Sequence, residues 1–255
     1  MELDDRMEYR VEKNLFKNKR CFIIGTGTSL DDVNMSLFDN EITIGINLIL
    51  KHPTFVPNYL VVGDTQVLKN HYHEIFSDKM NNGMYVLGNS CLLTGKGNCT
   101  DGPGSTCYGI PLDPKYKNIY SLEHWEKSEI FINHIADDRS KLLKTGEYYI
   151  DWEFFQWFTS YGASTVDNLA IPLAVYLGFK NIYLLGCDAG WDHFYDVNRR
   201  EGKREWINFN HVIKELDKFD MNLVNCDRTN VFPELKYKNL EYVIEYLEED
   251  VNEIN

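Results

Sequence analysis

Residues 21–30 read CFIIGTGTSL, four apolar residues followed by a glycine-rich turn. An apolar run without alternation is typical of a strand that is covered on both faces. Gly25 and Gly27 let the chain turn tightly and bring backbone N–H groups close to a ligand, and Thr28 or Ser29 can cap a following helix whose positive end faces that ligand. Leu30 replaces the third glycine of the dinucleotide fingerprint, and no Gly-Lys-Ser/Thr follows. The alternative is an ordinary strand-to-helix turn.

Strand and helix patterns alternate along most of the chain. Further apolar runs predict strands at 42–46, 59–62, 84–87, 181–185 and 222–224. Apolar residues at helical intervals predict helices at 31–38, 65–76, 165–177 and 206–219, and a final surface helix in 234–255. This alternation predicts an α/β fold of the Rossmann-like, doubly wound type, with a mainly parallel sheet.

Two segments interrupt the alternation. Residues 88–118 are rich in Gly, Asn, Cys, Thr and Pro and predict a long loop, and residues 121–158 are dense in aromatics and predict helices that cap one sheet edge. We therefore expect a single nucleotide-binding domain over 1–255, in which 88–158 is a loop plus an aromatic-rich helical cap and 189–205 is a lid loop.

The composition excludes several classes of protein. The chain has 255 residues, 44% of them hydrophobic and 25% charged, which is typical of a globular fold, and its net charge of −13 disfavours binding to nucleic acid. No apolar run is long enough to span a membrane, and the charged start does not resemble a secretory signal. The spacing of Cys91, Cys99 and Cys107 fits no standard zinc site, so no metal site is predicted there. We expect a cytoplasmic protein, and its composition is compatible with a homo-oligomer.

Polar residues follow the predicted strands where each strand ends. These residues are Asn47, Asp64, Asn89, Ser90 and Asp188. Because the carboxyl ends of parallel strands share one edge, where ligands bind, these residues together with the glycine turn predict a nucleotide-sized pocket. Ser164 and Thr165 precede a predicted helix, and they either cap it or add donors for a phosphate or carboxylate.

Several stretches resemble a known group of enzymes. These are IIGTGTSL, GIN and VVGD within residues 19–65, and GASTVDNLAIPLAVYLGFKNIYLLGCD within 159–190. They resemble the bacterial lipooligosaccharide sialyltransferases of glycosyltransferase family 42. They equally resemble a related domain family that contains the archaeal 6-hydroxymethyl-dihydropterin pyrophosphokinases and the motility-accessory flagellin glycosylation factors.

The resemblance implies roles for the matching residues. Gly25, Thr26, Gly27 and Ser29 would hold the nucleotide phosphate, with Thr28 in the same turn. Asn47 and Asp64 would contact the donor, and Ser164 and Thr165 would lie near the base or ribose. The sialyltransferases are expected to use a histidine base in a lid, with tyrosines that receive the leaving phosphate. The segment AGWDHFYDVNRREGKREWINFNHV offers His193, Tyr195 and His211 for these roles.

The chemistry of sugar transfer agrees with this choice of residues. Transfer from a nucleotide-activated sugar needs a base for the acceptor hydroxyl and stabilisation of the departing phosphate. His193 follows a strand end and is placed to be the base, with Tyr195, Arg199 or Arg200 on the phosphate. His211 falls on the predicted helix 206–219 and is either a second candidate or a packed core residue.

Three functions follow from these observations. The favoured one is a sialyltransferase-like enzyme that moves a sugar, a nonulosonic acid, from a CMP-activated donor to a glycan acceptor without a further cofactor. The second is a nucleotide pyrophosphokinase of the hydroxymethylpterin type, for which Mg²⁺ would be needed and Asp64 and Asp188 would be ligands. The third is a non-catalytic module that binds a nucleotide or a protein.

Overall fold

The fold is built on a parallel sheet, as the sequence predicts. The computed structural model describes residues 13–63, 67, 70–80, 83–87, 149–151, 156–158, 165–198, 209–228 and 231–246. Within these residues one sheet has seven strands, all paired in parallel. Its strands are β1 (Arg20–Ile24), β2 (Thr43–Ile46), β3 (Tyr59–Val62), β4 (Met84–Leu87), β7 (Asn181–Leu185), β8 (Asn222–Asn225) and β9 (Lys236–Tyr237).

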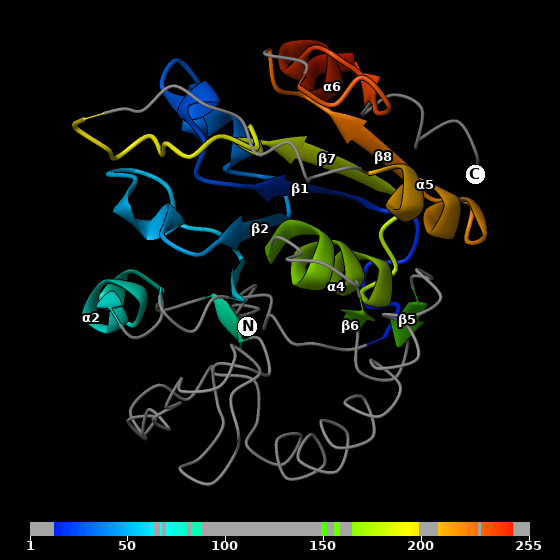
Figure 1. Ribbon diagram of the computed structural model, residues 1–255, viewed down its shortest axis with the longest axis horizontal. Coiled ribbons are helices and arrows are strands. Elements are labelled where there is room, and N and C mark those ends of the chain that lie inside the picture. Colours follow the sequence, from blue (N-terminus) through cyan, green and yellow to red (C-terminus); the bar gives the residue numbers. More distant parts are fainter. Residues whose placement is uncertain are drawn as a thin grey trace, which may run out of the picture.

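The order of the strands in the sheet is β4-β3-β2-β1-β7-β8-β9. The sequence pattern predicts the strands but not this order. The chain first proceeds from β1 to β4 on one side, and then from β7 to β9 on the other. The direction therefore reverses between β1 and β7, and ligands of open α/β sheets bind outside the carboxyl ends of the strands at such a reversal. Figure 1 shows the arrowheads of β1, β2 and β7 on the same side of the molecule.

Helices cover both faces of this sheet, which confirms the doubly wound fold. Cys21 and Ile23 of β1 pack in one apolar cluster with α4 (Ile171–Tyr176) and α5 (Asn210–Asp217). Phe22 and Ile24, whose side chains point to the opposite face, pack with residues of other helices. Those helices are η1 (Thr28–Leu30), η2 (Met35–Phe38), η3 (Ile49–Lys51), α2 (Tyr72–Ile75), η4 (Asp78–Met80) and α6 (Leu240–Tyr246). Figure 1 shows α4 and α6 on opposite sides of the strands.

Two predicted helices differ from the observed ones. The helix expected at 31–38 is replaced by the short 3-10 helices η1 and η2, because Asn34 accepts a hydrogen bond from Ser36 N at 3.2 Å and starts η2 afresh. The helix expected at 165–177 begins as a π-helix, η6 (Val166–Ala170), in which Ile171 N–H bonds to the Val166 carbonyl. Pro172, which follows, has no N–H to donate, and the chain continues as α4.

The predicted aromatic cap is described only in part. Residues 149–151 and 156–158 form an antiparallel pair, β5 (Tyr149–Asp151) and β6 (Gln156–Phe158), where the sequence analysis expected helix. Aromatic residues and Ile150 favour strands as strongly as they favour a helical cap, which explains the error. The strand β6 contacts η6 and α4. The rest of 88–148 lies outside the described residues.

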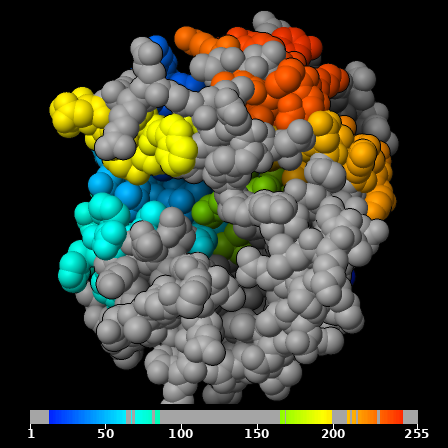
Figure 2. All heavy atoms as spheres, viewed as in Figure 1, coloured from blue at the N-terminus to red at the C-terminus, as the bar shows by residue number. Residues whose placement is uncertain are grey.

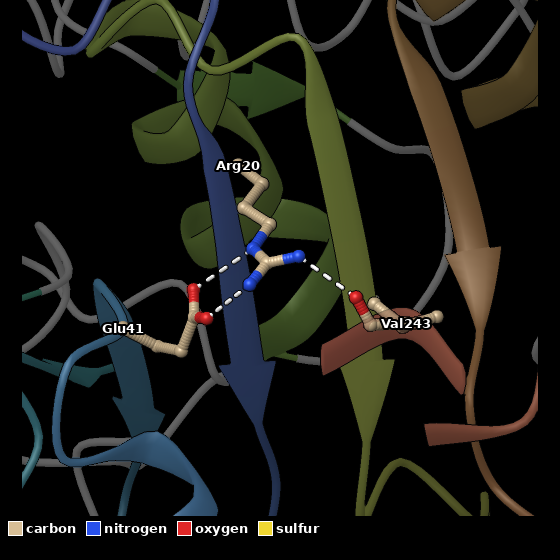
Figure 3. Close-up of polar contacts among 3 residues, drawn as sticks. All are labelled: Arg20, Glu41 and Val243. Carbon is tan, nitrogen blue, oxygen red and sulfur yellow. Dashed lines mark hydrogen bonds and ion pairs between the residues drawn. The ribbon is translucent and has the colours of Figure 1, made fainter. Parts of the chain in front are cut away.

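An ion pair holds the amino end of the sheet together, at the edge opposite the strand ends discussed below. Arg20 Nε donates to Glu41 Oε2 at 3.0 Å, a second guanidinium nitrogen donates to Glu41 Oε1, and Nη1 donates to the Val243 carbonyl of α6 at 2.8 Å (Figure 3). The side chains of Arg20 and Glu41 are only 15% and 10% exposed. This bidentate pair therefore ties β1, the segment before β2 and α6 to one another.

Among the helices in the described part of the chain, none combines the length and the apolar character needed to cross a membrane.

Candidate functional site

The glycine turn after β1 lies directly against the chain that leaves β7. Gly25 N donates to the Leu185 carbonyl at 2.8 Å, and Gly27 N donates to the Gly186 carbonyl at 2.7 Å. A Cβ on Gly25 would lie 2.8 Å from the Gly186 carbonyl carbon, and a Cβ on Gly27 would lie 2.5 Å from Asp188 Oδ2. Both glycines are therefore required for the close approach of the two strand ends.

Asp188 caps the helix η1 from the neighbouring strand. Its Oδ2 accepts hydrogen bonds from Ser29 N at 2.8 Å and from Thr28 Oγ1 at 3.3 Å, and its Oδ1 accepts one from Ser29 Oγ. The expectation that Thr28 or Ser29 would cap this helix is wrong, because Gly27 is the N-cap residue and makes no side-chain bond. Both hydroxyls donate to the Asp188 carboxylate, a stronger acceptor than a backbone group.

A second acid, Asp227, lies beneath the turn, and the sequence analysis missed it. Its side chain is fully buried, and it accepts hydrogen bonds from Gly186 N at 2.6 Å, Cys187 N at 3.0 Å and Ser29 Oγ at 2.9 Å. One signal could have found it: Cys226-Asp227 follows the last residue of β8, much as Gly186-Cys187-Asp188 follows β7. Asp227 thus joins the ends of three adjacent strands, β1, β7 and β8.

Burial first, and then the nearby Asp188 carboxylate, raise the pKa of Asp227 to about 7, against the opposing hydrogen bonds from Ser29 and the two amides. The Ser29 hydroxyl carries one proton, yet it lies within hydrogen-bond distance of both carboxyl groups. Two hydrogen bonds at Ser29 require a second proton on one of the acids, and the raised pKa assigns it to Asp227.

A second group of polar residues gathers at the ends of β2 and β3. Asn47 Nδ2 lies 3.4 Å from Thr165 Oγ1, and Asn47 N donates to the Val61 carbonyl at 2.8 Å. Asn47 has φ of 50°, a left-handed conformation that asparagine tolerates better than most residues. Thr165, the N-cap residue of η6, makes no side-chain capping bond, because its hydroxyl pairs with Asn47. These two residues are the expected donor contacts, and the fold brings them together.

A third group comes from the predicted lid segment after β7. Thr26 Oγ1 and His193 Nδ1 are 2.8 Å apart, and Phe194 N donates to the Thr26 carbonyl at 2.9 Å. The rings of His193 and Tyr195 stack, with centroids 5.0 Å apart and planes inclined by 16°. The segment therefore folds back onto the glycine turn, and the side chains of His193 and Tyr195 lie side by side next to Thr26.

The same segment also contacts the chain that follows β2. The Lys51 ammonium lies 4.6 Å from the centroid of the Tyr195 ring, and His52 packs edge-on against Phe194 at 5.5 Å. Figure 2 shows the yellow surface of this segment against the blue surface of the chain after β2. Burial first, and then Asp196, raise the pKa of Tyr195 to about 12, against a hydrogen bond with Thr26 that lowers it. Tyr195 is therefore a protonated donor near neutral pH.

The predicted site residues thus fall into three classes. The structure brings the turn 25–29 together with Asp188, His193 and Tyr195, and it places Asn47 with Thr165 at the same edge of the sheet. His211 lies in the first turn of α5, and its side chain is not described. Asp64, Asn89, Ser90 and Ser164 lie outside the described residues.

A metal would have few ligands among the residues that the structure places. No three acids, histidines or cysteines of the described ranges converge on one point. Asp188, the expected Mg²⁺ ligand in this part of the chain, uses its oxygens to accept hydrogen bonds from Thr28 and Ser29.

Comparison with known proteins gives similar folds at low sequence identity. No family model and no curated protein matches the sequence. Among solved structures, the sialyltransferase CstII from Campylobacter jejuni, in complex with the substrate analogue CMP-3FNeuAc, is 12% identical with a TM-score of 0.49, over 86% of this chain and 85% of that one. A CST-II complex with a trisaccharide acceptor and CMP is 13% identical, with a TM-score of 0.49 and the same coverage.

A third similar structure is the MAf glycosyltransferase from Magnetospirillum magneticum AMB-1. It is 14% identical with a TM-score of 0.42, over 91% of this chain but only 36% of that longer one. These structures come from the two groups that the sequence motifs resemble.

Proposed function

We propose that this chain is a glycosyltransferase that moves a nonulosonic acid from a CMP-activated donor to a glycan acceptor. The observation that carries the proposal is the position of His193. Its imidazole is hydrogen-bonded to Thr26 at the point where the strand order reverses, between the ends of β1 and β7. A titratable base held at the ligand-binding edge of an open sheet is what transfer to a hydroxyl acceptor needs. The CMP donor is what the resemblance of the motifs in 19–65 and 159–190 to the sialyltransferases implies.

The hydrogen bonds around Thr26 support a particular tautomer of His193. The Thr26 hydroxyl has one proton, and its hydrogen bond to the Tyr195 oxygen lowers the pKa of that phenol against burial and Asp196, which raise it. With this proton directed to Tyr195, Thr26 Oγ1 accepts Nδ1–H of His193, 2.8 Å away. The lone pair is then on Nε2, the nitrogen that would take a proton from the acceptor.

The proposed reaction is a single displacement at the anomeric carbon. The acceptor hydroxyl oxygen forms a bond to that carbon, its proton passes to His193 Nε2, and the bond between the carbon and the phosphate oxygen breaks. CMP leaves with the electron pair of that bond. Tyr195 remains protonated near neutral pH, and its ring stacks on that of His193 with centroids 5.0 Å apart. In the proposed reaction its hydroxyl donates a hydrogen bond to the leaving phosphate.

Asn47 and Thr165 complete the proposed donor site. Their side chains meet at the ends of β2 and β3, beside the β1 end that carries the glycine turn. An amide and a hydroxyl offer both donors and acceptors, which suits the ribose or the cytosine of the nucleotide.

The test compares nucleotides by thermal shift, using CMP, CTP, ATP and GDP, each with and without Mg²⁺. The proposal expects stabilisation by CMP in the absence of metal. Stabilisation by ATP only with Mg²⁺ would favour the pyrophosphokinase, and a protein that responds to none of them would be a module without this site.

The role of His193 is tested with His193→Ala, assayed with a CMP-nonulosonic acid donor and a panel of glycans. We expect turnover to fall by about 100-fold or more, typical of a lost general base, while the affinity for CMP is retained. His73→Ala, at an exposed position of α2, is the control. Unchanged turnover in His193→Ala would remove this residue from the mechanism.

A further inference from the structure

Three backbone donors of the glycine turn are already used within the chain. Gly25 N and Gly27 N donate to the carbonyls of Leu185 and Gly186, and Ser29 N donates to Asp188 Oδ2. The last of these donors lies in η1, where a phosphate would be expected at the start of a helix. The Asp188 carboxylate occupies this place as an anion that belongs to the protein.

A phosphate would not readily displace Asp188 from the turn. The carboxylate accepts three hydrogen bonds from Thr28 and Ser29, and it packs so closely on Gly27 that a Cβ there would overlap it. The buried carboxyl group of Asp227 lies on the other side of Ser29. A phosphate on the Ser29 amide would therefore meet the Asp188 carboxylate in a poorly solvated place, and like charges there repel strongly.

A cation lies at the same edge of the sheet, against the Tyr195 ring of the lid segment. Lys51 ends η3, just after β2, and its ammonium is 4.6 Å from the Tyr195 ring centroid. A cation over an aromatic face keeps its full charge, so it can still bind an anion. Two carboxylates lie near Lys51 and Tyr195. The pKa of Glu74 is lowered mainly by its hydrogen bond with His71 and also by Lys51. Asp196 accepts a hydrogen bond from the backbone N–H of His193 at 2.8 Å.

We propose that the phosphate of the bound nucleotide is held by Lys51 and the Tyr195 phenol, above the glycine turn, and not by the backbone amides of the turn itself. This inference rests on the proposed function and names its anion subsite. The turn and Asp188 then serve as a rigid floor, Thr26 positions His193 and Tyr195, and Lys51 supplies positive charge at this edge of a chain whose net charge is −13.

The experiment separates the phosphate from the rest of the nucleotide. Dissociation constants of CMP and of cytidine are measured by calorimetry for the wild type, Lys51→Gln, Lys51→Arg and Lys19→Gln. The dissociation constant of cytidine divided by that of CMP reports the phosphate contribution. The affinity for cytidine reports whether the rest of the site is intact. Lys19 is the matched control, because it also lies over an aromatic ring, that of Phe16 at 6.0 Å, but just before the amino end of β1.

We expect Lys51→Gln to reduce the ratio by about tenfold, the effect of one charge-assisted contact, with cytidine affinity retained. Lys51→Arg should keep most of the ratio, and Lys19→Gln should keep all of it. A ratio that is unchanged in Lys51→Gln overturns this inference while the proposed function stands. A wild type that binds neither CMP nor cytidine refutes the proposed function, and the inference with it.

Discussion

The buried carboxyl group of Asp227 should make the stability of the fold depend on pH in an unusual direction. Its pKa is about 7 in the folded protein against an ordinary value of 3.8, a difference of about 3 units. Each unit corresponds to about 1.4 kcal/mol, so the group changes the free energy of unfolding by about 4 kcal/mol. Because the folded state holds this proton more tightly than the unfolded chain does, the contribution is complete below pH 4. It is lost as pH rises to 7, and it stays constant above that.

The measurement is urea unfolding of the wild type and of Asp227→Asn between pH 4 and pH 8.5. Asparagine does not titrate, so the difference between the two proteins removes the contributions of other groups. We expect the stability advantage of the wild type to shrink by about 4 kcal/mol between pH 4 and pH 8.5, with most of the loss complete by pH 7. Asp220→Asn is the control, since Asp220 is exposed and pairs with Lys180 at the surface.

A difference that is flat across this range, or that grows with pH, would refute the assignment of the proton to Asp227. If Asp227→Asn does not fold, the carbon-13 shift of the Asp227 carboxyl group in the wild type reports the same titration directly. A midpoint near pH 4 there would also contradict the reasoning.

Two further substitutions test how the site and the sheet are built. Gly27→Ala places a Cβ 2.5 Å from Asp188 Oδ2, so the carboxylate must move and release Ser29. We expect a loss of about 2–3 kcal/mol in urea unfolding, and a smaller loss in an Asp188→Ala background, whereas equal losses would contradict the proposed overlap. Arg20→Met leaves the Glu41 carboxylate poorly exposed and without its bidentate partner, which should cost about 2–4 kcal/mol. Adding Glu41→Gln should restore part of this, and CMP affinity, measured by calorimetry, should not change because the pair lies at the other end of the sheet.

The local sequence was sufficient to locate six of the seven strands of the parallel sheet, whereas β9 lies in the segment 234–255, where only a surface helix was expected. Runs such as 59–62, 84–87 and 181–185 match β3, β4 and β7 residue for residue, because a strand buried on both faces must be apolar throughout. The helices were less accurate. Asn34 accepts a hydrogen bond from Ser36 N and so ends the helix expected at 31–38. Pro172 has no N–H to donate and marks the change from the π-helix η6 to α4. A periodicity pattern averages over many residues, so it does not register such effects of single side chains.

The site was predicted in its membership more than in its contacts. Strand-end residues were expected to meet because parallel strands end at one edge, and Gly27, Asn47 and Asp188 do so. Their partners were not predictable from spacing. Ser29 is 159 residues from Asp188 and 198 from Asp227, and nothing in the local pattern of either acid says which strand will lie beside it.

The sequence by itself therefore determined that this is a parallel α/β sheet with a polar, glycine-containing carboxyl edge, because burial and turn chemistry are read within a few neighbouring residues. Only the tertiary structure placed β7 against β1, filled the glycine turn with the Asp188 carboxylate, buried Asp227 beneath it, and brought Lys51 to Tyr195. Each of these contacts depends on how strands distant in the chain are ordered, and that order is selected by the packing of the whole sheet between its two helical layers.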